Sequence, residues 1–265
     1  MDRFFHSAGL SRPTLSLDEA ESHHAARVLR KQAGDRVELF DGRGQSAIAE
    51  ITLVKKDRVE VRIVELRKLL VAPLPTIRLA VAPPKGDRIR WLVEKATELG
   101  IDQLIPMMTE RTVVEPGGGK LDKLQAAVVA ACKQSGRDLV MQVAENTPFA
   151  ELIVAFRSAK ERASVEQKPT APVTSGVAHP TLLIGDPHGE LFQPGMIPVG
   201  SGEVLLLIGP EGGWSDAELD LASQSGARRV RIADQILRTE TAAIQLAGLC
   251  VWARSHHQGA MPIQE

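Results

Sequence analysis

Two charged residues stand where the sequence passes from a strand-like run to a helix. Glu211 lies in the loop 209–213 after the apolar run 204–208, and Arg238 precedes a helix expected to begin at Thr239. A carboxylate can accept a proton or attract a cationic ligand, and a guanidinium can neutralise developing negative charge. The loop alone is equally compatible with a tight turn that carries a solvated Glu211.

The loop Gly209-Pro210-Glu211-Gly212-Gly213 is not a common phosphate-binding motif. It has neither the Gly-x-x-x-x-Gly-Lys-Ser/Thr pattern of a P-loop nor the Gly-x-Gly-x-x-Gly pattern of a dinucleotide site. Glycines allow backbone N–H groups to approach a ligand closely. Ligands of open α/β sheets bind beyond the carboxyl ends of strands. The position of this loop after an apolar strand makes it a candidate ligand loop.

Other charged residues have simpler explanations that compete with a functional one. Thr239 and Glu240 suit the first turn of a helix, as a cap and as a complement to the helix dipole, whereas Arg238 has no such explanation. Lys85 and Arg88 stand at another strand-to-helix junction, where helix capping by Asp87 is the favoured interpretation.

A further loop with a cation, Gln134-Ser135-Gly136-Arg137, follows a helix. Cations also gather on one face of an N-terminal helix, which is either a solvated face or one that contacts phosphates. They belong to the run His23, His24, Arg27, Arg30 and Lys31.

The elements that must position these residues fall into two parts. In the first, a helix over 17–32 is capped by Ser16 or Asp18, and alternating runs indicate strands over 36–40, 46–51 and 59–64, which imply a small barrel. After a linker at 70–75, apolar strands alternate with helices, which indicates a parallel sheet covered on both faces. The strands are expected over 77–81, 104–107, 182–185, 204–209 and 229–232, and the helices over 87–99, 120–135, 215–225 and 239–254.

The composition excludes several classes of protein. The 265 residues are 43% hydrophobic and 25% charged, with a formal net charge of −1, which is typical of a globular chain and not of a strongly basic one. Cys132 and Cys250 form neither a disulfide framework nor a metal motif, so no metal is expected. Neither a signal peptide nor a membrane span is expected, which predicts a soluble, cytoplasmic protein. Residues 1–73 hold 13 basic and 11 acidic residues, a mild excess that suits an RNA-facing module.

The motifs resemble those of the RsmE family, the 16S rRNA (uracil-N3) methyltransferases of the SPOUT superfamily. The resemblance covers nearly the whole chain in order, and its last two motifs are highly specific. The matching segments are Arg3-Phe4-Phe5, His23-His24-x-x-Arg27-Val28-Leu29-Arg30, Gly34-Asp35, Phe40-Asp41-Gly42-Arg43-Gly44, Lys85-Gly86-Asp87-Arg88, 94–100, Thr109-Glu110-Arg111-Thr112, 131–137, 208–215 and 237–242. The exception is 158–180, which we interpret as a flexible insertion without a role in the chemistry.

The resemblance implies a fold and an activity that the patterns alone do not. It implies a SPOUT-type parallel sheet with a deep trefoil knot over 73–265, preceded by a small PUA-like β-barrel domain over 1–72 that contacts RNA. S-adenosylmethionine is then the cofactor, the enzyme is a homodimer, and the target is one uridine of small-subunit rRNA. The alternatives are a SPOUT methyltransferase for tRNA or ribose 2′-OH and a non-catalytic RNA-binding protein of ribosome assembly.

Under this resemblance the chemistry requires a cation and a proton acceptor. N3 of uracil is a poor nucleophile until its proton leaves, and the negative charge then spreads to O2 and O4. The candidate cations are Arg238 and Arg88, then Arg137, with Lys85 behind them. Glu211 ranks above Glu240 as the proton acceptor, although recognition of the cationic end of the cofactor explains Glu211 nearly as well.

The resemblance also assigns contacts to the cofactor and to RNA. The expected cofactor contacts are Leu183, Ile184, Gly185, Ile208, Gly209, Pro210, Glu211, Gly212, Gly213, Ile232, Leu237, Arg238, Thr239 and Ala242. The expected RNA contacts are Arg3, His24, Arg27, Arg30, Lys31, Arg43, Lys85, Arg88 and Arg137.

Overall fold

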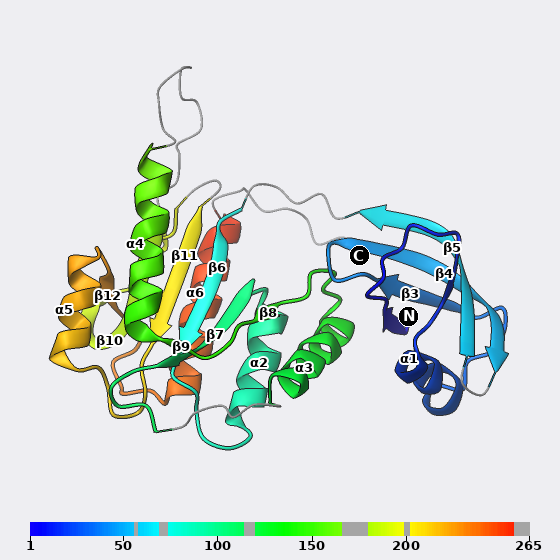
Figure 1. The fold of residues 1–265 in the computed structure, drawn as a ribbon, viewed down its shortest axis with the longest axis horizontal. Helices are drawn as coiled ribbons and strands as arrows, with labels where there is room; N and C mark the ends of the chain where they lie inside the picture. Colours follow the sequence, from blue (N-terminus) through cyan, green and yellow to red (C-terminus); the bar gives the residue numbers. More distant parts are fainter. Residues whose placement is uncertain (56–57, 69–73, 114–119, 166–179, 199–201, 257–265) are drawn as a thin grey trace. The chain divides into compact units, whose positions relative to one another are not determined.

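The computed structural model describes residues 1–55, 58–68, 74–113, 120–165, 180–198 and 202–256 (Figure 1). The chain forms two compact units. The first contains 1–71 together with 128–140, and the second contains 72–127 with 141–265. The segment 128–140 thus joins the N-terminal unit, to which the sequence patterns did not assign it.

The first unit is built on a five-stranded sheet in the order β1-β3-β4-β5-β2. The pairs are antiparallel except for β1 and β3, which run parallel. Alternate apolar side chains of β3, β4 and β5 are buried in one core, which confirms the three predicted strands. Among the described residues no pairing joins β1 to β2, so the expected barrel is here a sheet with two edges. The strands are β1 (Arg3–Phe5), β2 (Thr14–Ser16), β3 (Arg36–Phe40), β4 (Gln45–Lys55) and β5 (Arg58–Lys68).

The helix predicted over 17–32 is shorter and less regular than expected. Asp18 caps α1 (Glu19–His23) by accepting a hydrogen bond of 2.8 Å from the Glu21 amide. The chain then widens into a π-helical turn, η1 (His24–Val28). Arg30 has a left-handed φ of 53°, and this conformation cannot continue a right-handed helix.

A seven-stranded sheet organises the second unit, with the order β12-β10-β11-β6-β7-β8 and β9 paired to β7. All its pairs are parallel, which confirms the expected class of fold. The strands are β6 (Thr76–Val81), β7 (Gln103–Met108), β8 (Gln142–Val143), β9 (Thr147–Pro148), β10 (Thr181–Leu191), β11 (Glu203–Ile208) and β12 (Arg228–Arg231).

Helices cover both faces of this sheet (Figure 1). One face packs on α4 and α5 through a shared apolar core. The other face contacts α6, which packs against α2. The helices are α2 (Arg88–Leu99), α3 (Lys120–Ser135), α4 (Phe149–Val165), α5 (Asp216–Gln224) and α6 (Thr239–His256), with a 3-10 turn η2 (Pro194–Met196). The trefoil knot is a matter of chain threading and stays a prediction.

The interpretation of 158–180 as a loop is wrong for its first eight residues. α4 extends to Val165, because Phe149, Ile153 and Phe156 bury one face of the helix and its polar continuation stays helical in solvent. The rest of the expected insertion, 166–179, lies outside the described residues. Within the described part of the chain, no helix is long and apolar enough to cross a membrane.

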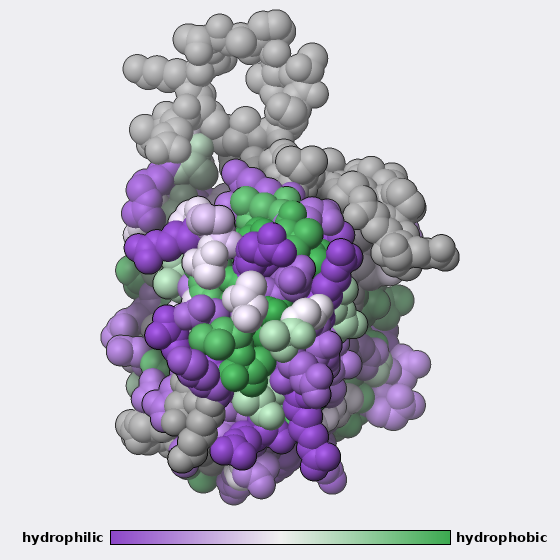
Figure 2. Space-filling view, turned by 90° about the vertical axis from the view of Figure 1, so that its right-hand side faces the viewer, coloured by the Kyte–Doolittle hydropathy of each residue, from purple (hydrophilic) through white to green (hydrophobic). Residues whose placement is uncertain are grey.

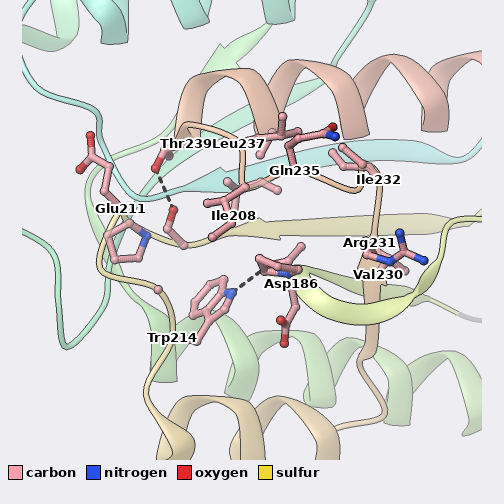
Figure 3. A pocket seen from close by; sticks show the side chains of 18 residues that line it. Asp186, Ile208, Glu211, Trp214, Val230, Arg231, Ile232, Gln235, Leu237 and Thr239 are labelled. Atoms are coloured by element: carbon pink, nitrogen blue, oxygen red, sulfur yellow. Dashed lines mark hydrogen bonds between the residues drawn. The ribbon is translucent and has the colours of Figure 1, made fainter.

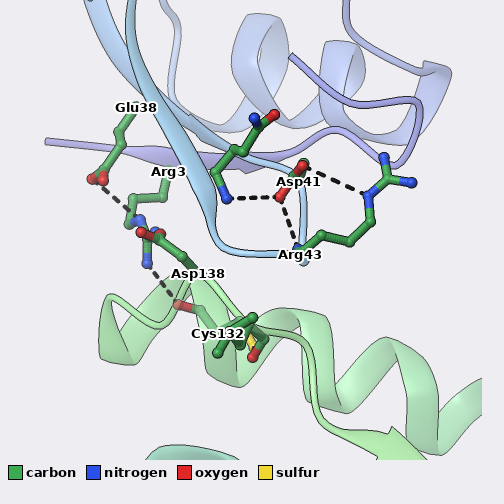
Figure 4. A network of polar contacts seen from close by, with 8 residues as sticks. Arg3, Glu38, Asp41, Arg43, Cys132 and Asp138 are labelled. Atoms are coloured by element: carbon green, nitrogen blue, oxygen red, sulfur yellow. Dashed lines mark hydrogen bonds and ion pairs between the residues drawn. The ribbon is translucent and has the colours of Figure 1, made fainter. Parts of the chain in front are cut away.

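Arg3 was expected to contact RNA. In the structure its side chain is instead buried in the first unit. Its side chain is only 7% exposed, because it forms ion pairs with Asp138 and Glu38 and donates a hydrogen bond of 3.0 Å to the carbonyl of Cys132 (Figure 4). The guanidinium also stacks 4.7 Å from the centre of the Phe40 ring. These contacts attach residues 132–138 to the N-terminal strands.

We expect Arg3→Met to destabilise the protein by about 2–3 kcal/mol, since two poorly solvated carboxylates lose their cation. Urea unfolding followed by circular dichroism measures this change. Arg67→Met is the matched control, because the Arg67 and Glu65 side chains of this ion pair are 55% and 56% exposed. An unchanged midpoint for Arg3→Met together with weaker RNA binding would restore Arg3 as an RNA contact.

Candidate functional site

A pocket lies beyond the carboxyl ends of β11 and β12 and beside residues 185–187 of β10, where the loops 209–215 and 232–238 meet (Figure 3). The parallel register brings these strand ends to one edge of the sheet, since Gly185 pairs with both Ile208 and Val230. This is the edge at which open α/β sheets bind ligands. The two loops singled out from the sequence therefore form one site.

Most of the residues expected to contact a cofactor line this pocket. They are Gly185, Ile208, Gly209, Pro210, Glu211, Gly213, Ile232, Leu237, Thr239 and Ala242. Four others do not. Leu183 and Ile184 are fully buried within β10, while Gly212 and Arg238 lie in the two loops without lining the pocket.

Close packing explains two glycines of the site. A Cβ on Gly209 would lie 2.9 Å from the indole ring of Trp214, and a Cβ on Gly185 would lie 2.7 Å from Cδ1 of Ile208. The indole Nε1 of Trp214 donates a hydrogen bond of 2.9 Å to the Gly185 carbonyl. The Thr239 hydroxyl donates one of 3.2 Å to the Gly209 carbonyl. These contacts connect both loops to the end of β10.

Arg111 holds the outer side of the glycine loop, a role that the sequence did not reveal. Its Nη1 donates hydrogen bonds of 2.8 Å to the Gly212 carbonyl and 3.2 Å to the Trp214 carbonyl. A Cβ on Gly212 would meet Arg111 at an ordinary 3.4 Å, so this position does not require glycine for space. The only signal for Arg111 was its place in the motif Thr109-Glu110-Arg111-Thr112.

The structure places Arg88 between the two candidate proton acceptors. Its Nη1 lies 3.0 Å from Oε1 of Glu240 and 3.6 Å from Oε1 of Glu211, and its Nε donates to the Lys85 carbonyl at 3.2 Å. Three residues from three separate motifs therefore form one cluster. Sequence spacing alone could not show this arrangement, because it depends on how β6, β11 and α6 pack.

Glu240 is held as a carboxylate. Burial by itself would raise its pKa, but a backbone hydrogen bond, the hydrogen bond from Arg88 and the charges of Arg88 and Arg238 hold the pKa below its usual value. A carboxylate of low pKa is a weak proton acceptor. One oxygen, Oε2, is buried without a hydrogen-bond partner among the described residues. Arg238 is exposed and has no ion pair within the described part of the chain.

The pocket also contains polar residues that the motifs did not suggest. Asp186, at the end of the apolar run of β10, is buried and accepts hydrogen bonds of 2.6 Å from Arg229 and 2.8 Å from the His188 amide. An aspartate directly after a buried strand was the available signal. Figure 3 shows Glu211 and Arg231 toward opposite ends of the pocket.

No group of three or more His, Cys, Asp or Glu in the described regions is arranged to hold a metal ion.

The expected RNA contacts are distributed over both units. In the first unit Arg27 and Arg30 are exposed, while His24 packs edge-on against Phe4. Lys31 pairs with Asp2 at 2.6 Å, and this hydrogen bond raises the pKa of Lys31. Arg43, which is exposed, donates to the Ser7 carbonyl, and Arg137 is half-buried in the same unit. Lys85 is exposed in the second unit.

Two family models match the chain and define its class. A model described as an RNA methyltransferase domain matches residues 72–251, and one described as an RNA methyltransferase PUA domain matches residues 17–64. The protein is therefore an RNA methyltransferase with an N-terminal PUA domain.

Named relatives identify the family. The chain is 31% identical over 231 residues to "Ribosomal RNA small subunit methyltransferase E" of Synechocystis sp., covering 86% of this chain and 70% of the relative. The relative of the same name in Bacillus subtilis is 27% identical, with 88% and 87% covered. The chain belongs to the ribosomal RNA small subunit methyltransferase E family.

Solved structures agree with this assignment. The ribosomal RNA small subunit methyltransferase E of Neisseria gonorrhoeae, bound to S-adenosyl methionine, has a TM-score of 0.77 at 29% identity and covers 97% of both chains. A putative methyltransferase of Legionella pneumophila in complex with the same cofactor has a TM-score of 0.76 at 28% identity, with 95% and 97% covered.

Proposed function

We propose that this protein methylates N3 of one specific uridine in small-subunit ribosomal RNA, with S-adenosylmethionine as the methyl donor. The observation that supports this most strongly is the pocket beyond the carboxyl ends of β11 and β12 and beside β10, which combines both motif loops with Glu211. The family assignment favours this reaction over methylation of tRNA or ribose and over a non-catalytic role. An rRNA substrate also suits a cytoplasmic protein.

The lining of the pocket suits the chemistry of S-adenosylmethionine. Ile208, Val230, Ile232 and Leu237 offer apolar surface for an adenine ring, and the carboxylate of Glu211 offers a partner for a cationic group. When bound, the cofactor supplies the methyl group that is transferred. Backbone groups of the glycine loop would make many of its contacts, since the loop has few polar side chains of its own.

Three charged residues around the pocket have separate proposed roles in charge stabilisation, proton acceptance and positioning. Arg238 is free to face a uracil oxygen and to stabilise the negative charge that deprotonation of N3 creates. Glu211 is the proposed proton acceptor. Arg88 is a positioning residue, because it ties Glu211 to the buried Glu240.

Transfer of radiolabelled methyl groups tests the proposal directly. Purified protein is incubated with labelled S-adenosylmethionine and with small subunits or rRNA from a strain that lacks this gene, and the nucleosides are then separated. We expect label in N3-methyluridine. Label in a 2′-O-methyl nucleoside, or in tRNA alone, would favour the other enzymatic reading. Absence of cofactor binding in calorimetry would favour the non-catalytic reading.

Arg111→Ala should weaken binding of S-adenosylmethionine about tenfold, because the glycine loop loses two charge-assisted hydrogen bonds. Calorimetry measures the affinity, and a thermal melt reports the fold. Arg67→Ala, which breaks an exposed pair with Glu65 in the first unit, is the control. Equal affinities for both variants would show that Arg111 does not position the loop.

We also propose that the protein is a homodimer that uses the outer face of α6 and α2. The helix α6 keeps Ile244, Leu249 and Val251 only partly buried within one chain. Trp252 and Trp91 are 48% and 43% exposed on these two packed helices. Light scattering should give twice the chain mass at micromolar concentration, and Trp252→Glu should give a monomer. A wild-type monomer would refute the proposal.

A further inference from the structure

The first unit contains a second hollow, unrelated to the pocket of the parallel sheet. Its volume is about 390 Å³, within the usual range of roughly 300–1,000 Å³ for small-molecule sites. It is lined by the segment that follows the edge strand β1 and by β2, the other edge strand of the five-stranded sheet. Its polar lining comes from His6, Ser11, Arg12, Thr14 and Ser16.

Two polar groups of this hollow, on His6 and Arg12, lack partners among the described residues. Nδ1 of His6 is buried without a hydrogen bond, which costs free energy unless a ligand or water satisfies it. Arg12 is exposed and forms no ion pair among the described residues. No lining residue carries a carboxylate, so the charge of Arg12 is not compensated within the hollow.

Backbone groups of the edge strands and the side chain of Arg43 add further hydrogen-bonding groups near the hollow. β1 pairs only with β3 and β2 only with β5 in the described part of the unit, so each strand has a backbone edge without a strand partner. The guanidinium of Arg43 donates to the Ser7 carbonyl and lies 3.1 Å from a Cβ position on Gly9, which also lines the hollow. Figure 2 shows hydrophilic side chains around several apolar patches on the face of the molecule turned to the viewer.

We infer that this hollow binds one phosphate-bearing nucleotide of the RNA substrate, outside the nucleotide that is methylated. The guanidinium of Arg12 pairs with the phosphate, and the hydroxyls of Ser11, Thr14 and Ser16 and the His6 ring bind its oxygens or the ribose. The hollow is a cavity lined by several polar side chains, whereas Arg27, in the turn η1, and Arg30, after it, are exposed on the surface. The identity of the ligand as RNA rests on the proposed function.

Binding of a small probe tests the site without any activity assay. Uridine 5′-monophosphate and uridine are titrated separately into the full chain, and the ring nitrogens of His6 are followed by ¹⁵N NMR. We expect the His6 signals to shift with the monophosphate and not with uridine. Arg12→Ala should weaken the binding about tenfold, because it removes a charge-assisted contact. Arg67→Ala, an exposed arginine paired with Glu65, should leave it unchanged. No shift with the monophosphate would overturn the inference.

Methyl transfer to RNA then shows whether the hollow binds a nucleotide within the RNA strand or a free nucleotide. In methyl transfer to small-subunit rRNA, Arg12→Ala should raise the KM for RNA about tenfold and leave kcat and the KM for S-adenosylmethionine unchanged. The log–log salt slope should fall by about 0.7 if the lost phosphate is in a single strand. An unchanged KM for RNA, in a variant that no longer binds the monophosphate, would identify a free-nucleotide site and refute this inference. An inactive wild-type protein that still binds the monophosphate through Arg12 would refute the proposed function and not the site.

Discussion

Arg238→Lys is expected to lower kcat about 100-fold at saturating S-adenosylmethionine and RNA, with less than a threefold change in cofactor affinity. Lysine retains the charge, but it loses the planar pair of donors that can face a uracil oxygen. Removing one such donor from a site of developing negative charge typically costs between about 100-fold and 1,000-fold in kcat. Single-turnover methyl transfer measures the effect.

The position of Arg238 makes this prediction specific. The side chain is exposed beside the pocket, does not line it and is not held by an ion pair in the described residues. Arg67→Lys, an exposed arginine of the first unit paired with Glu65, is the control. A loss of cofactor affinity with an unchanged kcat would make Arg238 a binding residue instead.

Gly209→Val is expected to weaken binding of S-adenosylmethionine at least 100-fold. A Cβ at this position would lie 2.9–3.2 Å from three atoms of the Trp214 ring, so the ring or the loop must move. Movement of the ring breaks its hydrogen bond to the Gly185 carbonyl and disturbs the wall of the pocket. Calorimetry measures the affinity, and circular dichroism checks that the sheet is intact.

Gly195→Val is the matched control for this prediction, since a Cβ on Gly195 would meet nothing within 4 Å. Gly212→Val gives a second comparison, because its Cβ would make only ordinary contacts with Arg111. We expect a much smaller effect there than at Gly209. Wild-type affinity in Gly209→Val would exclude the 209–215 loop from the cofactor site.

The sequence predicted the elements that depend on local patterns. Apolar runs predicted β6, β11 and the first part of β10, and the helix expected over 215–225 is α5, with Ser215 as its N-cap. The glycine loop after β11 and the loop before α6, both chosen as candidates from the sequence, line one pocket. Both predictions work because strand ends and helix starts are encoded within a few residues.

Features that depend on tertiary packing were missed. Arg3 was assigned to RNA from the family resemblance, and nothing local in the sequence shows that Asp138 and Glu38 bury it. The same packing places 128–140 in the first unit. A fragment that begins near Leu74 would therefore lose the partners of this segment as well as the N-terminal sheet, and truncation cannot separate RNA binding from catalysis cleanly.

The cluster of Arg88, Glu211 and Glu240 also depends on tertiary packing, which the sequence does not show. Glu240 looked like a helix cap and Arg88 like a solvated charge, and each description is locally reasonable. Their 3.0 Å contact arises only when α2 and α6 pack together. This contact is one of the interactions that hold the pKa of Glu240 below its usual value. Glu211, which lies 3.6 Å from Arg88 and is half-exposed, stays the proposed proton acceptor.

Primer extension on small-subunit rRNA tests the central claim most directly. N3-methyluridine blocks the Watson–Crick edge, so reverse transcriptase stops beside it. The account predicts one uridine stop in rRNA from wild-type cells, its loss in a strain without this gene, and its return with the wild-type gene but not with Arg238→Lys at limiting expression. An identical stop pattern with and without the gene would contradict the account.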